Sequence, residues 1–223
     1  MGKITQYSAL NLISDARVNP EKWSRIPSNT AIANTINAIE KRGIKVILVK
    51  SGQEALEILK NLIPPGAEVM NGSSTTLIEI GYEDFIRTDQ SGWKNLHDII
   101  ISENNDKNRA ELRRKSVTAE YFISGANGIA QSGEIIACDA SGSRVGAWPF
   151  AAEHLILVCG INKIVPTLDN ALHRVWEYAY PLEDARAKKV YGIPSQIGKC
   201  VILANEQNRE RIKLILINES LGY

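Results

Sequence analysis

The chain has 223 residues, of which 44% are hydrophobic and 23% are charged, and its formal net charge is +1. This composition is typical of one ordinary globular domain, and the near-neutral charge excludes a broad electrostatic surface for nucleic acid. No apolar run approaches the ~20 residues that a membrane span needs. The first residues also lack the apolar core of a signal peptide. We therefore expect a cytoplasmic protein that binds neither nucleic acid nor membranes.

The first half of the sequence alternates helical and strand patterns. Polar residues at Ser28 and Ser51 mark helix starts, and Gly43 and Pro64 mark helix ends. This order of elements is typical of a parallel sheet that is covered on both faces. The predicted helices cover residues 8–18, 30–42 and 53–62, and the predicted strands cover 44–49, as a buried strand, and 67–70.

The second half is less regular. Residues 82–102 read as an irregular surface segment in which Trp93 is exposed as a lid or dimer contact, and 103–115 as an exposed polar helix. We expect a helix over 168–180 that Pro181 ends, because proline lacks the backbone N–H that helix propagation needs. Strands are predicted over residues 121–123, 134–138, 155–159 and 213–217, with loops over 125–130 and 139–144.

We therefore predict an α/β fold that is Rossmann-like, with a mainly parallel sheet and helices on both faces. One domain covers residues 1–223, and residues 1–28 form an N-terminal helical extension. The cysteines, Cys138, Cys159 and Cys200, are odd in number and widely spaced, which indicates neither a disulfide framework nor a metal knuckle. The three histidines share no metal-binding spacing, so no metal site is predicted.

A small polar loop follows the strand over residues 67–70. It reads Asn71-Gly72-Ser73-Ser74-Thr75-Thr76 and leads into an apolar helical pattern. Backbone N–H groups and hydroxyls at such a point form a binding site for an anion. The alternative is a polar turn whose hydroxyls only cap the helix. Glu79, one helical turn later, either faces the same ligand as an acid or base or is a solvated carboxylate.

Other candidate residues follow later strands. Gly142-Ser143-Arg144 offers a guanidinium that can hold a carboxylate or phosphate through two hydrogen bonds, or it is a surface turn. Asn162 and Lys163 follow the strand over 155–159, where a lysine can neutralise an anion or remain in solvent. Glu134 is a second candidate acid or base. In parallel sheets the loops at the carboxyl ends of strands form the ligand crevice, so we expect 71–76, 124–130 and 160–163 to converge. The loop 139–144 joins them if the chain turns back toward the same edge.

Several of these segments together resemble one known family. Residues 72–81, GSSTTLIEIG, resemble the "GGS-x-T-x-x-E-x-G" loop of the lactate-utilisation (LUD) domain, and residues 123–134 resemble its second glycine-containing segment. Further matches are GSRV at 142–145 with the family's "GNRV", VCGINKIV at 158–165 with its "VVAGxNKIV", and ESLGY at 219–223 with its terminal "ExLGY". The resemblance extends over residues 8–223 in the family's order.

This resemblance implies an α/β fold of the sugar-isomerase/CoA-transferase-like (NagB/RpiA/CoA transferase-like) superfamily. It also implies a part in the oxidation of L-lactate to pyruvate beside an iron–sulfur partner. The chain departs from the family in two places: Asn71 replaces the first glycine of the loop, and Ser195 stands where many relatives have a cysteine. Only Cys200 remains in that segment, and one cysteine cannot hold a zinc ion or an iron–sulfur cluster. No cofactor is identifiable in this chain.

The leading hypothesis is a protein that binds a small organic acid and oxidises lactate with a separate electron acceptor. Arg144 or Lys163 would hold the carboxylate, residues 71–76 would hold its oxygens, and Glu79 or Glu134 would act as acid or base. The second hypothesis is a non-catalytic subunit or sensor in which the same loop binds a phosphorylated metabolite and signals through an interface. The third is a phosphosugar isomerase or CoA-transferase-like enzyme, which rests on fold analogy. A homo-oligomer is compatible with each of these hypotheses.

Overall fold

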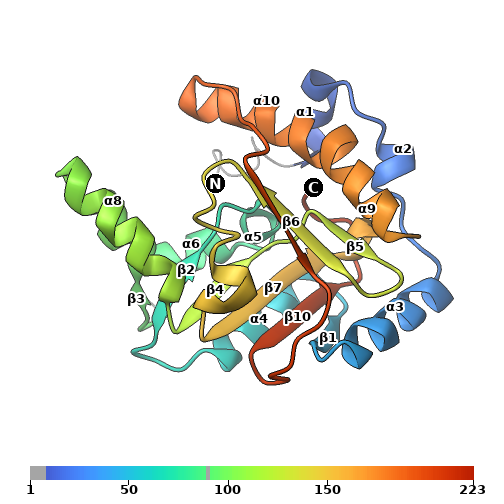
Figure 1. Cartoon of the computed structure of the whole chain (residues 1–223), viewed down its shortest axis with the longest axis horizontal. Coiled ribbons are helices and arrows are strands. Elements are labelled where there is room, and N and C mark those ends of the chain that lie inside the picture. Colours follow the sequence, from blue (N-terminus) through green and yellow to red (C-terminus); the bar gives the residue numbers. More distant parts are fainter. Residues whose placement is uncertain (1–8, 89–90) are drawn as a thin grey trace.

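A computed structural model describes residues 9–88 and 91–223 of the chain. Its main sheet has six strands, and every neighbouring pair is parallel (Figure 1). The order is β1-β10-β7-β4-β2-β3, so the predicted mainly parallel, Rossmann-like α/β fold is confirmed. The strands are β1 (Lys45–Val49), β2 (Glu68–Asn71), β3 (Lys94–Asn95), β4 (Tyr121–Ser124), β7 (His154–Gly160) and β10 (Ile212–Ile217).

A smaller sheet packs on one face of the main sheet. Its order is β8-β5-β6-β9, with β5 parallel to β8 and antiparallel to β6, and β6 antiparallel to β9. The expectation of a loop over 125–130 was wrong, because this segment contains β5, and β9 was not among the predicted elements. Gly128 allows β5 to lie close to a helix, since a Cβ atom there would be 3.1 Å from the Ala171 carbonyl oxygen. The strands are β5 (Gly128–Ala130), β6 (Ile135–Asp139), β8 (Ile164–Val165) and β9 (Lys199–Leu203).

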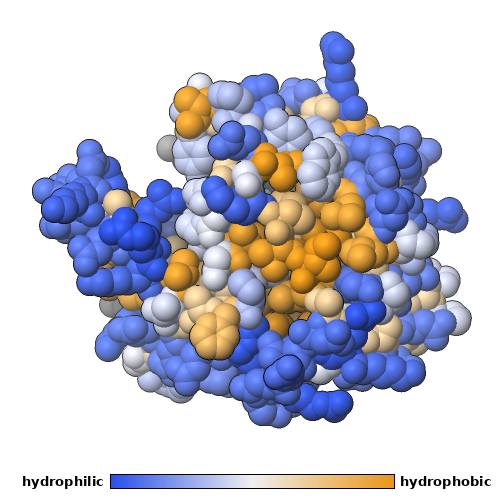
Figure 2. All heavy atoms as spheres, in the orientation of Figure 1, coloured by the Kyte–Doolittle hydropathy of each residue, from blue (hydrophilic) through white to orange (hydrophobic). Residues whose placement is uncertain are grey.

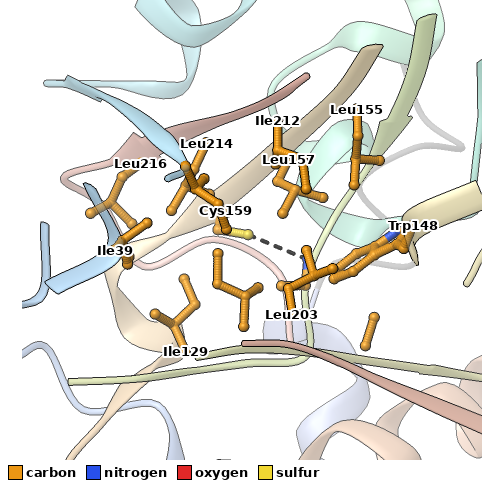
Figure 3. Close-up of a cluster of buried hydrophobic side chains, with 14 of the residues drawn as sticks. Ile39, Ile129, Trp148, Leu155, Leu157, Cys159, Leu203, Ile212, Leu214 and Leu216 are labelled. Atoms are coloured by element: carbon orange, nitrogen blue, oxygen red, sulfur yellow. Dashed lines mark hydrogen bonds between the residues drawn. The ribbon is translucent and has the colours of Figure 1, made fainter. Parts of the chain in front are cut away.

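The largest hydrophobic core fills the space between the two sheets. Figure 3 shows side chains of β7 and β10 facing Ile129 of β5 and Leu203 of β9. Ile39 of helix α3 (Asn29–Lys41) and Trp148 of a π-helical turn, η3 (Ala147–Ala151), close the sides. Both sheets are thus held by burial of apolar surface, which stabilises by roughly 25 cal/mol per Å².

Helices cover the remaining faces. On the far side of the main sheet, α4 (Gly52–Leu62), α5 (Thr75–Glu79) and α6 (Tyr82–Arg87) contribute to a second core. On the outer side of the small sheet, a third core joins α1 (Ala9–Ala16), α2 (Pro20–Trp23), α9 (Leu168–Arg174) and α10 (Tyr180–Tyr191). The predicted N-terminal helical extension therefore contains α1 and α2, while its residues 1–8 lie outside the described residues.

The described residues of the segment 82–102 form more regular structure than the sequence indicated. It contains α6, β3 and α7 (Leu96–Ser102). The prediction of an exposed Trp93 was wrong: its indole is buried, donates to the Ile63 carbonyl at 3.2 Å, and meets the edge of Phe85 with ring centroids 5.5 Å apart. An aromatic ring between polar neighbours gives no periodic signal, so only tertiary packing shows its burial.

Pro181 does not end the helix before it. A π-helical turn, η5 (Val175–Ala179), joins α9 to α10, and Pro181 lies in the first turn of α10. The wider turn removes the need for the N–H that proline lacks, so the chain continues to Tyr191. The helix ends at Gly192, which has a left-handed φ of 73°.

Helix α8 (Asp106–Lys115) projects from the rest of the described structure, and none of its residues is buried (Figure 1). Figure 2 shows this helix as hydrophilic, whereas apolar side chains gather in the middle of the same view over β5 and β6. The predicted polar helix is therefore confirmed. Within the described residues, no helix has both the length and the apolar character that would let it cross a bilayer.

Candidate functional site

A pocket of about 340 Å³ lies at the carboxyl ends of β2 and β4, beside the small sheet. The residues after β2 form one wall, residues 125–127 after β4 form another, and Lys163 closes the end beyond β7. The chain thus brings the small polar loop, Arg144 and Lys163 to one cavity. Among the candidate residues, the pocket is lined by Asn71, Gly72, Ser73, Ser74, Thr75, Ser143, Arg144 and Lys163.

The loop after β2 combines capping and pocket-lining roles. Ser74 is the N-cap of α5, and its hydroxyl accepts a hydrogen bond from the backbone N–H of Leu77 at 3.4 Å. Helix α5 has only five residues, so its dipole is a small attraction for an anion. Ser73 is exposed, whereas Asn71 and Thr75 are buried at the pocket wall. Because the short helix contributes little, the positive charge that an anionic ligand needs must come from other side chains.

Lys163 supplies one such charge. It lies in a 3-10 turn, η4 (Ile161–Lys163), after β7, and only 1% of its surface is exposed. Its ammonium donates to the Thr76 hydroxyl at 3.0 Å and to the Ala126 carbonyl at 2.9 Å. Burial lowers the pKa of Lys163 to about 8, and the negative charge of Glu79 opposes this shift.

Arg144 supplies the second charge. Its guanidinium donates to the Gly125 carbonyl at 2.6 Å, to the Asn127 side-chain oxygen at 3.0 Å and to the Cys138 carbonyl. Burial lowers the pKa of Arg144. The turn that carries it is held by Asp139, whose carboxylate accepts from the backbone N–H groups of Arg144 and Val145, each at 2.9 Å, and of Gly142.

The pocket is also lined by an ionic group of α10, in which Arg186 is buried and Glu183 is partly exposed. Glu183 and Arg186 of α10 form two hydrogen bonds of 2.7 and 2.8 Å, and the Tyr223 hydroxyl donates to Glu183 at 2.6 Å. Burial opposes the charge on Arg186, but the bonds from Glu183 raise its pKa. Both carboxylates that line the pocket, Asp139 and Glu183, are thus already bound by donors of the protein.

A comparison with known protein families shows to which family this chain belongs. The model of the LUD domain matches residues 32–217. The chain belongs to the LUD domain family. A crystal structure of a DUF162 family protein from Deinococcus radiodurans is similar to it, with a TM-score of 0.51 and 12% identity, and the alignment covers 86% of this chain and 100% of that chain. At this identity the similarity shows the fold. No curated protein matches the sequence.

Five of the predicted residues of this LUD domain do not line the pocket. Thr76 lies behind it, where it binds Lys163, and Gly142 lies in the turn that Asp139 holds. Asn162 holds the C-terminal segment: its amide donates to the Gly222 carbonyl at 3.0 Å and accepts from the Leu221 N–H at 3.1 Å. Thr76, Gly142 and Asn162 therefore support segments next to the pocket without lining it. The other two are the carboxylates proposed as acid or base.

The structure places both candidate carboxylates elsewhere. Glu79 accepts from the backbone N–H of Gly222 at 2.7 Å. Glu134 lies outside the pocket and forms an ion pair with Arg42 and a hydrogen bond with Ser132. Burial alone would raise the pKa of Glu134, but the hydrogen bond from Ser132 and the charge of Arg42 bring it below its ordinary value. Glu79 lies outside the pocket, where its negative charge raises the pKa of Lys163 against the larger lowering by burial, and Glu134 is bound to Arg42 and Ser132.

Sequence reasoning missed several lining residues of the LUD pocket. Glu183 and Arg186 are three positions apart on a helix, a spacing that indicates an ordinary surface ion pair. Tyr223 belongs to the terminal ESLGY segment, the one signal that pointed to it. No group of three or more His, Cys, Asp or Glu residues that could hold a metal ion occurs in the part of the chain that the structure describes. Other polar lining residues that were not among the predicted site residues include Asn127, Asp139, His97, Arg113 and Tyr180.

Proposed function

We propose that this LUD domain binds the carboxylate of a small organic acid, L-lactate or pyruvate, between Lys163 and Arg144. The loop Asn71–Thr75 would face the remaining oxygens of the acid. We also propose that the domain takes part in the oxidation of L-lactate to pyruvate. Because that reaction releases two electrons, it requires an acceptor, which we propose to be a separate iron–sulfur protein.

The observation that carries this proposal is that the Lys163 ammonium is buried and that, in the part of the chain that the structure describes, its hydrogen-bond partners include no carboxylate. It is buried at the pocket end, and its hydrogen bonds go to two neutral oxygens, those of Thr76 and Ala126. A buried charge is costly unless an opposite charge compensates it, so an anion in the pocket would stabilise the protonated lysine. Arg144 points to the same conclusion because its guanidinium also donates to neutral oxygens, those of Gly125, Asn127 and Cys138.

The acids that line the pocket support an anionic ligand. The Asp139 carboxylate is occupied by backbone N–H groups, and Glu183 is occupied by Arg186 and Tyr223. Among the described residues that line the pocket, the cationic side chains outnumber the side-chain carboxylates: the cations are Lys163, Arg144, Arg186 and Arg113. The excess positive charge favours a ligand with at least one negative group.

The lysine also offers an acid–base group for the oxidation. Removing two electrons from lactate converts the C2 hydroxyl to a carbonyl and releases two protons, one from the hydroxyl and one from C2, and the hydroxyl proton needs a base beside it. With a pKa of about 8, Lys163 is partly neutral near neutral pH and can take a proton. A transferase would instead need a carboxylate nucleophile in the pocket. Both carboxylates proposed for that role, Glu79 and Glu134, lie outside it.

Calorimetric titration of the purified chain tests the binding proposal. The ligands are L-lactate, pyruvate, inorganic phosphate and coenzyme A, each titrated into wild type, Lys163→Met and the matched control Lys45→Met, whose lysine is exposed at the start of β1. We expect lactate or pyruvate to bind wild type and the control, and binding to weaken at least tenfold in Lys163→Met. Binding of phosphate or coenzyme A alone would favour a phosphorylated metabolite and reject the organic acid.

A second measurement separates binding from catalysis. The chain is mixed with L-lactate and a soluble redox dye, and dye reduction is followed by absorbance. We expect binding without dye reduction by this chain alone. Rapid reduction by the chain alone would contradict the need for a separate electron-accepting partner.

A further inference from the structure

Two of the three cysteines lie opposite each other on neighbouring strands of the small sheet. In the antiparallel pair of β6 and β9, Cys138 lies directly opposite Cys200. Side chains of directly opposed residues project from the same face of a sheet. The two thiols are therefore neighbours although the residues are far apart in the sequence, which is why their spacing gave no sign of a pair.

The backbone hydrogen bonds show which kind of pair this is. The N–H of Cys138 points away from β9 and donates to the Asn127 side chain at 2.9 Å, and the Ile136 carbonyl, two residues earlier, accepts from the Asn127 N–H at 2.8 Å. Cys138 and Cys200 thus form a pair without mutual backbone hydrogen bonds. The Cα atoms of such pairs are ~4.5 Å apart. This separation lies within the ~4.4–6.8 Å that a disulfide spans.

We propose that Cys138 and Cys200 are a site of reversible oxidation. A low-molecular-weight disulfide such as oxidised glutathione is the oxidant, and exchange with it joins the two cysteines in an intramolecular disulfide. Cys200 is exposed and Cys138 is buried at the pocket wall, so the reagent reaches Cys200 first. The Cys200 thiolate attacks the reagent and releases one reduced thiol. The Cys138 thiolate then attacks the Cys200 sulfur and releases the second, so two protein thiols are oxidised and one disulfide reagent is reduced to two thiols.

The order of attack agrees with the surroundings of each thiol. Burial raises the pKa of Cys138, and Cys200 beside it raises it further, so Cys138 is the poorer first nucleophile. The site also adjoins the pocket, because the Cys138 backbone binds Asn127 and Arg144. The bond would fix edge strand β9 to a strand of the pocket wall. This inference does not depend on which ligand the pocket takes.

Cys159, the third cysteine, serves as an internal control for this proposal. Cys159 is fully buried in β7 of the other sheet, and its sulfur accepts from the Ala126 N–H at 3.3 Å (Figure 3). Trypsin also separates the three thiols, because cleavage after lysine and arginine places Cys138 in residues 116–144, Cys159 in 145–163 and Cys200 in 200–209. A linked pair of peptides therefore identifies the bond without ambiguity.

The test treats the fully reduced chain with oxidised glutathione, counts free thiols, and maps tryptic peptides after the remaining thiols are blocked. We expect the wild type to fall from three free thiols to one, with peptides 116–144 and 200–209 linked, and dithiothreitol to reverse the change. Cys159→Ser should form the same link. Cys138→Ser should stop at a glutathione adduct on Cys200.

Cys200→Ser keeps the test decisive if Cys138→Ser fails to fold, because position 200 is exposed. This variant should retain both remaining thiols under the same treatment. Two results would overturn the inference. One is a wild-type chain that carries only a stable glutathione adduct on Cys200. The other is a disulfide that joins two copies of the chain through Cys200.

Discussion

The side chain of Arg144 crosses directly over Gly72. A Cβ atom at position 72 would lie 2.4 Å from Cδ and 2.6 Å from Cγ of Arg144, and 3.2 Å from its Cβ. The contact involves the start of the arginine side chain, whose far end is held by Gly125 and Asn127. The glycine is therefore needed for close approach of two loops, one after β2 and one after β6.

Replacing Gly72 with alanine should displace Arg144 from its carbonyl partners. We expect a loss of unfolding free energy of about 1–3 kcal/mol, typical of overpacking, and at least a tenfold loss of affinity for the carboxylate ligand. Chemical denaturation and calorimetric titration measure the two effects. Ser73→Ala, at the exposed neighbouring position, is the control and should leave stability within about 0.5 kcal/mol of wild type. Unchanged affinity in Gly72→Ala would remove Arg144 from the binding site.

The buried Lys163 predicts how stability depends on pH. Its pKa is lowered from 10.5 to about 8 in the folded chain, so between these values the unfolded state binds more protons than the folded state. Stability should then rise with pH across this window, by up to ~3 kcal/mol relative to Lys163→Met. Below pH 8 both states carry the charge, and the cost of burying it is fully present. Parallel stability curves for wild type and Lys163→Met from pH 7 to 11 would contradict the burial of a protonated lysine.

Ligand affinity should show the opposite trend with pH. A carboxylate gains from the charged form of Lys163, and a group with a pKa of about 8 is mostly protonated at pH 7 and mostly neutral at pH 9. We expect lactate or pyruvate to bind ~tenfold more weakly at pH 9 than at pH 7. Titrations at several pH values measure this. The residual binding of Lys163→Met should be flat over the same range, and an equal decline in that variant would assign the effect to another group.

Asn162 predicts a coupling between the end of β7 and the C-terminal segment. Its side chain is buried and binds Ser24, Leu221 and Gly222. Asn162→Ala should leave the Leu221 N–H and the Gly222 carbonyl unpaired, at a cost of about 2–3 kcal/mol. Amide hydrogen exchange of residues 219–223 should accelerate because Leu221 and Gly222 lose their anchor. In the control, Asn218→Ala, an exposed side chain is removed from the same segment and exchange should remain as in wild type.

The sequence by itself determined the local elements. Ser28 and Ser51 cap helices where predicted, because N-cap chemistry depends on a few adjacent residues. The apolar runs that end near Met70 and Cys159 form parallel strands of the main sheet, and the loops after them face a pocket. The family resemblance, now shown by the match over residues 32–217, rests on the same short segments. Each of these features can be read within a window of about ten residues.

Only the tertiary structure decided the rest. The small sheet joins short strands from distant segments, and its pairing places Cys138 against Cys200. Burial lowers the pKa of Lys163. The fold also places the Tyr223 hydroxyl beside Glu183 and pairs Glu134 with Arg42. The physical reason is the same in each case: strand pairing, desolvation and charge pairing depend on which residues meet in space, and sequence spacing does not record those contacts.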